Sequence, residues 1–427
     1  MTREPPDAAR GAPDAVLPTG AAPDSALSTG AAPESALSTG AAPDVFAPAG
    51  LGPVRLRNRI IKSATFEGLT PRGEVTDALI DFHRRVAEGG AAMTTVAYCA
   101  VAPEGRTERR QIVLGPAAVP GLRRLTDAVH AAGAAASAQL GHAGPVSDAS
   151  STRLPALGPS RRLNPMSFRV TRAATSEDLA RIVAAHADAA WWAAEAGFDA
   201  VELHFGHNYL ISSFLSPRFN RRSDRWGGTL ENRARLARDV ARAVRDRVGG
   251  RLAVLAKLNM SDGVRGGLEV PESLRVARWL EDDGTLDALE LTCGSSLANP
   301  MYLFRGGVPL AEFAAAFRQP LRAGIRLFGR SVLRSYPYRD GYLLDDARRF
   351  RAALDMPLVL LGGVTDRAVM DRAMAEGFQF VAMGRALLME PDLPNRLRAD
   401  ASVRSACTHC NRCMPTIYSG TRCVLRG

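Results

Sequence analysis

Lysine is almost absent from this sequence of 427 residues: Lys62 and Lys257 are the only two, and arginine supplies the remaining basic charge. The formal net charge of +10 invites a nucleic-acid interpretation. However, the arginines are scattered among acids, as around Arg238 and Asp239, and are not interleaved with aromatic residues. High arginine, alanine and glycine contents indicate a general compositional bias, so we expect no nucleic-acid partner.

Long apolar runs are also missing. No stretch approaches the roughly 20 apolar residues of a membrane-spanning helix, and the N-terminus lacks the pattern of a signal peptide. We expect a soluble, cytoplasmic protein without a membrane partner. Hydrophobic residues still make up 46% of the chain, which is enough for a sizeable core.

Aromatic residues are absent before Phe46, and residues 1–50 repeat a ten-residue unit rich in proline, alanine, glycine and serine. Such a segment cannot bury enough apolar surface to offset the entropy lost on ordering. We predict a disordered low-complexity tail; a partner-binding arm is the alternative.

From residue 51 onward, short β-rich runs alternate with amphipathic stretches. Eight strands are predicted, at Arg59–Phe66, Ala92–Cys99, Ala136–Leu140, Ala200–His204, Leu252–Asn259, Ala288–Thr292, Leu358–Leu361 and Phe380–Met383. Helices are predicted at Thr76–Glu88, Gly121–Ala132, Glu177–Ala196, Leu230–Val248, Glu272–Glu281 and Arg367–Glu376. This α/β alternation within residues 51–400 predicts an eightfold (β/α) TIM barrel. An open doubly wound sheet is the alternative, but no GxGxxG motif follows the first strand.

The long stretch Asn299–Tyr342 does not fit a single helix. Long loops at the carboxyl ends of barrel strands usually cover the active site, so we interpret it as a substrate-covering insertion.

The densest polar group lies in Val201–Leu210. Because strand side chains alternate, Glu202 and His204 are predicted to face the barrel interior, where ionisable groups must pair or act. His207 and Tyr209 follow the strand. Two imidazoles could donate hydrogen bonds to a substrate oxygen, and the phenol could deliver a proton. The alternatives are a satisfied polar cluster and a zinc site, although no third zinc ligand is evident in the barrel.

Glycines follow the last two predicted strands: Gly362 and Gly363 after the seventh, and Gly384 with Arg385 after the eighth. Glycine backbones can approach a phosphate closely, and a guanidinium offers paired donors to its oxygens. Each feature alone is more often a turn, but their place on the last two strands favours a phosphate site.

These features together resemble the signature of old yellow enzymes, which are FMN-dependent NAD(P)H oxidoreductases. The matching stretches are VELHFGHNYL at 201–210, SSFLSP at 212–217 and GGTLENR at 227–233, with Asn220, Arg222 and Asp224 between them. The resemblance implies FMN at the carboxyl face of the barrel and NAD(P)H as reductant. It also implies that His204 and His207 bind the activating oxygen of a small-molecule substrate, and that Tyr209 protonates its α-carbon.

Further flavin contacts are implied by the resemblance. It assigns the FMN phosphate to Gly362, Gly363, Gly384 and Arg385, the flavin ring edge to Gln139, and a flavin-contacting opening to Ala64 and Thr65. A buried amide bonded to the backbone is the alternative for Gln139. The sequence departs from the family at Phe66 and Tyr98, where smaller residues are common, so redox potential and pocket shape do not follow from the resemblance.

Lys257 lies inside an apolar strand, and a buried ammonium needs an anionic partner. A reduced flavin is one such partner, because a cation near its pyrimidine edge favours uptake of a hydride. The family usually has arginine or lysine here. A structural ion pair with an inward carboxylate such as Glu202 is the alternative.

Four of the six cysteines lie in the predicted C-terminal segment 401–427: Cys407, Cys410, Cys413 and Cys423. This spacing is typical of a metal site. The longer relatives 2,4-dienoyl-CoA reductase and trimethylamine dehydrogenase carry an iron–sulfur cluster in a similar place, with slightly different cysteine spacing. We expect a [4Fe–4S] cluster, with structural zinc or free, redox-active thiols as alternatives.

The sequence thus predicts an ene-reductase that reduces activated C=C bonds. One alternative is an amine dehydrogenase or demethylase that passes electrons through a Cys-bound cluster. Another is a non-catalytic flavin- or metal-binding protein. Both a homo-oligomer and an external redox partner are left open.

Overall fold

Eight parallel strands close into a barrel in the computed structural model, which describes residues 42–164 and 169–426. The strands follow the order β3, β4, β5, β9, β10, β11, β12 and β13, and β13 pairs with β3. Their bounds are Ile60–Lys62, Met93–Ala100, Ala135–Gly141, Ala200–Phe205, Ala253–Asn259, Ala288–Thr292, Leu358–Leu360 and Phe380–Met383. The predicted TIM barrel is confirmed, and its closure excludes the open sheet.

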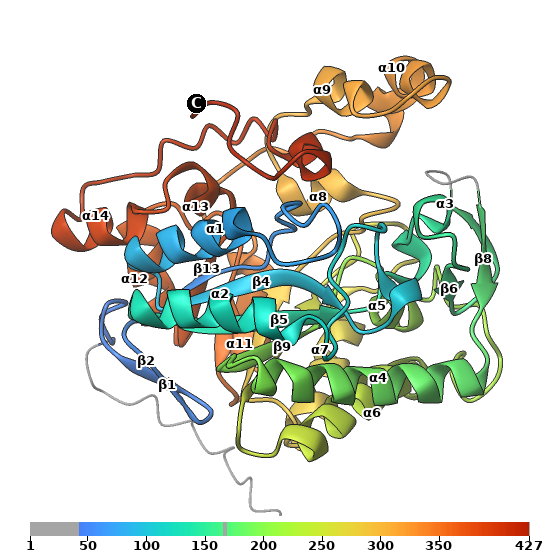
Figure 1. The fold of residues 1–427 in the computed structure, drawn as a ribbon, viewed down its shortest axis with the longest axis horizontal. Helices are drawn as coiled ribbons and strands as arrows, with labels where there is room; N and C mark the ends of the chain where they lie inside the picture. Colours follow the sequence, from blue (N-terminus) through green and yellow to red (C-terminus); the bar gives the residue numbers. More distant parts are fainter. Residues whose placement is uncertain (1–41, 165–168, 427) are drawn as a thin grey trace, which may run out of the picture. The chain divides into compact units, whose positions relative to one another are not determined.

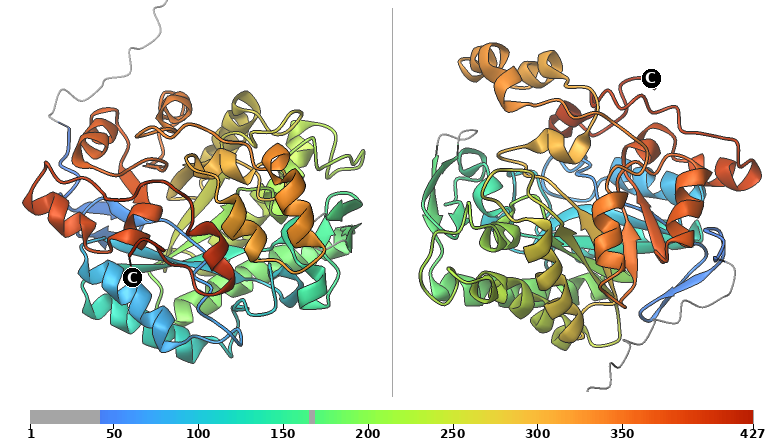
Figure 2. Two further views of the ribbon diagram at one scale, coloured as in Figure 1. Left: turned by 90° about the horizontal axis from the view of Figure 1, so that it is seen from above. Right: turned by 180° about the vertical axis from the view of Figure 1, so that it is seen from behind.

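Helices connect the strands and lie outside the barrel (Figure 1, Figure 2). The predicted ones are α1 (Asp77–Glu88), α2 (Val119–Ala131), α4 (Ser176–Glu195), α6 (Leu230–Val248), α7 (Val270–Asp282) and α12 (Arg367–Ala375). In α6, the Thr229 side chain accepts a hydrogen bond from the first turn, and Leu236, Val240 and Val244 form a buried stripe at four-residue spacing. The amphipathic period therefore locates these helices.

Shorter elements complete the described chain. The helices are α3 (Ala149–Thr152), α5 (Leu210–Leu215), α8 (Pro300–Phe304), α9 (Leu310–Ala315), α10 (Leu321–Val332), α11 (Leu344–Arg351), α13 (Arg385–Met389) and α14 (Leu393–Ala399). The 3-10 turns are η1 (Pro103–Gly105), η2 (Gly144–Val146) and η3 (Met414–Tyr418). The strands outside the barrel are β1 (Ala49–Leu51), β2 (Val54–Leu56), β6 (Leu157–Gly158), β7 (Arg162–Asn164) and β8 (Arg169–Ala173).

Apolar side chains fill the barrel interior toward the amino ends of the strands. One buried cluster there includes Ile61, Met93, Ala200, Leu255, Ala288, Val359 and Phe380. The hairpin of β1 and β2 adds Leu51 and Leu56 to the same cluster. This end is therefore closed by packing, and polar interior residues lie toward the carboxyl ends.

Two segments differ in detail from the secondary structure predicted for them. The sequence predicts a first strand over Arg59–Phe66, whereas β3 ends at Lys62. Beyond it, the Ser63 N–H still donates to the Met383 carbonyl of β13 at 3.0 Å, but the Ser63 carbonyl accepts from the Lys62 ammonium and the Thr65 hydroxyl, at 2.8 and 3.1 Å. Asn299–Tyr342 contains the three short helices α8, α9 and α10, with α8 beside the carboxyl ends of the strands and α9 and α10 further out (Figure 1).

The predicted tail lies mostly outside the described residues, which begin at 42 and enter β1 at Ala49. Its disorder and the proposed domain boundaries stay predictions. Within the described ranges, no helix has both the length and the apolarity needed to cross a membrane.

Candidate active site

The loop after β9 turns sharply at the carboxyl end of the barrel. His207 and Asn208 have left-handed backbones, with φ of 60° and 58°. The His207 N–H donates to the Asn259 side chain at 3.0 Å, and the Asn208 N–H donates to Ser212 Oγ at 3.2 Å. Left-handed non-glycine residues are held only by such surrounding contacts and are frequent at functional sites.

The two predicted histidines form a hydrogen-bonded chain. The Gly206 N–H donates to His204 Nδ1 at 3.2 Å, which places the proton of a neutral His204 on Nε2. That nitrogen lies 3.4 Å from His207 Nδ1, and His207 Nε2 lies 3.0 Å from the Thr292 hydroxyl. With both imidazoles neutral, the His204 Nε2–H donates to His207 Nδ1 and the His207 Nε2–H donates to the Thr292 hydroxyl, so a bound substrate atom would have to take over one of these bonds.

Electrostatics keep both imidazoles neutral. Burial lowers the pKa of His204 well below its usual value, and the neighbouring His207 and Lys257 add to this effect. Burial, followed by Lys257, lowers the pKa of His207 to about 3. The pair can therefore donate hydrogen bonds to developing negative charge without being a proton source itself.

Tyr209 lies directly beside this pair. Its ring stacks on His204 with centroids 4.4 Å apart, and Tyr98 contacts it edge-on at 5.5 Å. Burial raises the pKa of Tyr209, so the phenol stays protonated at neutral pH. The Tyr98 hydroxyl donates to the Gly105 carbonyl at 2.7 Å, and Ala64 packs in the same small cluster. Tyr98, which stands where smaller residues are common in the family, thus narrows the barrel mouth beside Tyr209.

Two neighbours of Tyr209, Ser296 and Tyr418, were not predicted from the sequence. Burial has the largest effect on the pKa of Tyr209, and the nearby Tyr418 raises this pKa further. A hydrogen bond with Ser296 lowers it. Tyr418 ends η3, and its ring contacts Phe317 at 5.5 Å. The C-terminal segment therefore reaches the active-site mouth, a long-range contact that leaves no local pattern in the sequence.

A polar layer lies between the histidines and the apolar floor. Lys257 Nζ lies 3.0 Å from Glu202 Oε1 and 3.1 Å from Glu290 Oε1. Gln139 Nε2 donates to Glu202 at 2.7 Å, and Ser63 Oγ donates to Glu290 at 2.7 Å. Lys257 therefore forms an ion pair with Glu202, which the sequence suggested as the alternative to a contact with the flavin. Glu290 was missed, although it is an inward residue of β11.

The predicted phosphate residues lie on adjacent strands. Gly362 and Gly363 have φ of 97° and 78° after β12, and Gly384 follows β13, which pairs with β12. No heavy atom lies within 4 Å of where a Cβ of Gly384 would stand. Arg385 adds a guanidinium, whose Nη1 donates to the Arg305 carbonyl at 3.0 Å. The open space at Gly384 beside a fixed cation fits a phosphate group, whereas Gly362 packs against Leu343 and Gly363 against the backbone of Gly341.

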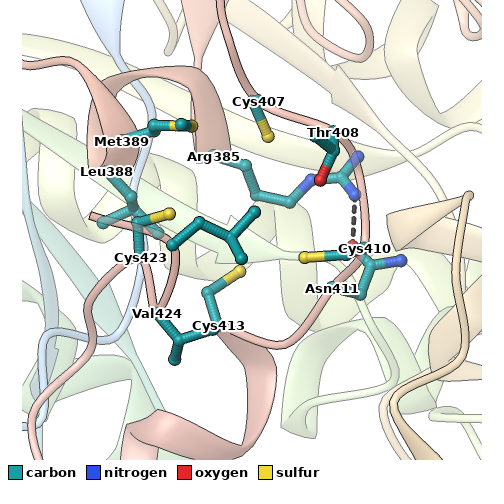
Figure 3. A pocket seen from close by; sticks show the side chains of 11 residues that line it. Arg385, Leu388, Met389, Cys407, Thr408, Cys410, Asn411, Cys413, Cys423 and Val424 are labelled. Carbon is teal, nitrogen blue, oxygen red and sulfur yellow. Dashed lines mark hydrogen bonds between the residues drawn. The ribbon is translucent and has the colours of Figure 1, made fainter. Parts of the chain in front are cut away.

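The four C-terminal cysteines surround one recess (Figure 3). Their sulfur atoms point toward its centre, and Arg385 also borders it. Asn411 holds this loop in place, because its amide donates to the Arg305 and Gly307 carbonyls at 3.1 and 2.8 Å and accepts from Arg385. Burial raises the pKa of Cys413 to about 11.

Four thiols are the donor set of a tetrahedral zinc ion and also of an iron–sulfur cluster. Among the described residues, no three cysteine, histidine or acidic side chains converge closely enough to hold one metal ion. Tetrahedral zinc needs four sulfurs about 2.3 Å from a common point.

Comparison with known proteins identifies the family. The model of the NADH:flavin oxidoreductase / NADH oxidase family matches residues 44–290. The chain belongs to this family. It is 54% identical over 382 residues to 4,4'-dithiodibutanoate disulfide reductase of Rhodococcus erythropolis, covering 90% of this chain and 95% of that protein.

Solved structures agree with this assignment. A 2-naphthoyl-CoA reductase complex superposes with a TM-score of 0.76 at 25% identity, over 89% of this chain and 56% of that one. The old yellow enzyme homologue of Zymomonas mobilis gives 0.68 at 22% identity, over 86% and 96%, and this likeness concerns the fold. The chain is therefore an FMN-type NAD(P)H oxidoreductase of the old yellow enzyme family, which rules out a non-catalytic protein.

Proposed function

We propose that this family member uses NAD(P)H to reduce small organic disulfides to thiols. The observation that carries the proposal is the 54% identity to a disulfide reductase, which extends over 95% of that relative. The 382 aligned residues make up 90% of this chain, so the alignment extends over most of the barrel.

The proposed reaction converts one disulfide and NAD(P)H with one proton into two thiols and NAD(P)⁺. When bound, FMN supplies the hydride that it has taken from NAD(P)H. Gly384 and Arg385 would hold the FMN phosphate, and Gln139 and Lys257 lie where the flavin ring edge would rest. Ala64 and Thr65, which follow β3, would contact the ring.

The histidine pair would assist cleavage of the S–S bond. One sulfur receives the hydride, and the other leaves with the electron pair of the broken bond as a thiolate. The neutral His204 and His207 would donate N–H hydrogen bonds to this sulfur, where negative charge develops. A thiol has a pKa of about 8.5, so its thiolate is a weak base and is poorly protonated by the Tyr209 phenol, whose pKa is raised. The thiolate therefore takes its proton from water.

Reduction of activated alkenes is the second candidate, and the position of Tyr209 favours it. Hydride transfer to an alkene leaves a carbon that needs a proton, and this carbon is far more basic than a thiolate. A protonated phenol stacked beside the oxygen-binding histidines is suited to that step. The same site can therefore support both reactions with different demands on Tyr209.

We further propose that Cys407, Cys410, Cys413 and Cys423 hold an iron–sulfur cluster. Their position around one recess supports this proposal. A cluster beside Arg385 would also allow exchange of electrons with an external redox partner. An amine dehydrogenase or demethylase, the alternative function, would require such electron transfer.

The test is an anaerobic assay of the FMN-loaded chain with NADH or NADPH and 4,4'-dithiodibutanoate. Two thiols released for each NAD(P)H consumed would support the proposal, with free FMN and heat-denatured protein as controls. An α,β-unsaturated ketone assayed in parallel tests the second candidate. Flavin that is reduced by NAD(P)H but is not reoxidised by the disulfide would refute disulfide reduction.

A further inference from the structure

Two buried carboxylates share one ammonium inside the barrel. Glu202, Lys257 and Glu290 lie on the adjacent strands β9, β10 and β11, and none is more than 2% exposed. The register of the sheet sets Lys257 beside Glu290, and Lys257 Nζ contacts Oε1 of both glutamates at 3.0 and 3.1 Å. Glu290 Oε2 is buried without a hydrogen-bond partner among the described residues.

The neighbouring strands supply hydrogen bonds but few further charges. Ser63 from β3 donates to Glu290, and Gln139 from β5 donates to Glu202. His204 and His207 lie above the layer and are neutral because burial lowers the pKa of each. Thr95 of β4, Leu361 directly after β12 and Ala382 of β13, which lie near this layer, are not ionisable.

Two more charged groups, Lys62 and Glu67, lie close by. Lys62 donates to the Ser63 carbonyl at 2.8 Å, and Glu67 lies near both Lys62 and His83. Burial lowers the pKa of His83, which keeps it neutral. Two ammonium groups thus face three carboxylates, so the fully ionised set carries one excess negative charge.

An excess buried charge is costly, and a proton relieves it. A proton on one carboxyl lets it bond the other, and the remaining carboxylate still pairs with Lys257. Burial raises the pKa of Glu202 to about 7, with Lys257 opposing the rise and Glu290 adding to it. The apolar floor closes the other end, so protons exchange through the barrel mouth.

We propose that Glu202 and Glu290 form a one-proton site that fills when the flavin above it is reduced. The inference rests on the proposed binding of FMN at the mouth. NAD(P)H delivers two electrons and one proton as hydride to the flavin, and one further proton moves from water to the carboxyl pair. The negative charge added to the flavin disfavours the ionised pair, and the pair releases its proton when the substrate reoxidises the flavin.

The test is the midpoint potential of the FMN-loaded full chain measured from pH 6 to pH 9. A tenfold change in proton activity shifts a two-electron couple by about 30 mV for each proton taken up. Around and above pH 7, we expect the wild-type potential to fall about 30 mV per pH unit more steeply than that of Glu290→Gln. This variant keeps the side-chain shape and leaves Glu202 paired with Lys257 one to one.

Glu272→Gln is the matched control, because Glu272 pairs with Arg233 on the outer helices at 2.5 Å. It should keep the wild-type slope. Equal slopes for wild type and Glu290→Gln would overturn the proposal. If Glu290→Gln does not fold, a wild-type slope no steeper than that of free FMN overturns it. A wild-type chain without a flavin spectrum refutes the proposed function as well, and this is seen before any titration.

Discussion

The ring of Tyr209 lies stacked on the imidazole of His204, with centroids 4.4 Å apart and planes inclined by 24°. The stack fixes the phenol beside the histidine pair that is proposed to bind developing negative charge. Since it involves only the rings, Tyr209→Phe should keep the geometry and remove the hydroxyl alone. The variant therefore isolates the proton-donor role.

Tyr209→Phe should separate the two candidate reactions. We expect alkene reduction to fall by about 10² to 10⁴, the usual contribution of a general acid. Disulfide reduction should change by less than about threefold, because the leaving thiolate needs no proton from a phenol. Stopped-flow measurement of flavin reoxidation by each substrate checks this. Equal losses for both substrates, or slower flavin reduction by NAD(P)H, would contradict the assignment.

Gly384→Ala tests the phosphate site. The added methyl group would project into space that holds no heavy atom within 4 Å, where the FMN phosphate is proposed to lie. We expect at least tenfold weaker FMN binding, while the free energy of unfolding of the apoprotein changes by no more than about 1 kcal/mol. FMN fluorescence titration and urea unfolding measure the two effects. Gly115→Ala, at another open glycine position, should alter neither.

Periodicity predicts the barrel well because each strand is a short buried run and each outer helix has one apolar stripe. α6 matches its predicted bounds, Leu230–Val248, since Thr229 caps one end and Gly249 ends the other. β3 is predicted too long because propensity does not reveal that side chains near Ser63 bond to the local backbone.

Contacts within the site are harder to predict than the site itself. The motif locates His204, His207 and Tyr209, which the structure brings together. Glu290 lies far from Lys257 in sequence, and only the register between β10 and β11 makes them neighbours. The approach of Tyr418 likewise depends on how the C-terminal segment folds back over the barrel, which no local spacing encodes.

Buried neutral histidines should make the protein sensitive to mild acid. Burial lowers the pKa of His186 to about 4 and that of His142 to about 3. Between these values and about 6.5, the unfolded chain binds protons that the folded chain does not, so the free energy of unfolding decreases as pH falls. Each such histidine contributes at most about 1.4 kcal/mol per pH unit.

His186→Gln provides the check, since His186 is fully buried on α4 and lies outside the candidate site. Urea unfolding at pH 7, 6 and 5 should show a shallower loss of stability for the variant, by about one proton's contribution. A slope unchanged from wild type would mean that His186 is not the source of the acid sensitivity.

Iron content distinguishes the candidate states of the cysteine segment. We expect the anaerobically purified chain to hold about four iron atoms with equal sulfide, no stoichiometric zinc, and broad visible absorption beyond that of flavin. Cys407→Ala removes one of the sulfurs that border the recess and should lower the iron content sharply. Cys293→Ala is the matched control, because Cys293 is buried elsewhere and burial raises its pKa to about 12. Stoichiometric zinc would contradict a cluster at this recess, and so would iron that both variants retain equally. A metal-free chain with four titratable thiols would also contradict it and would favour thiol chemistry instead.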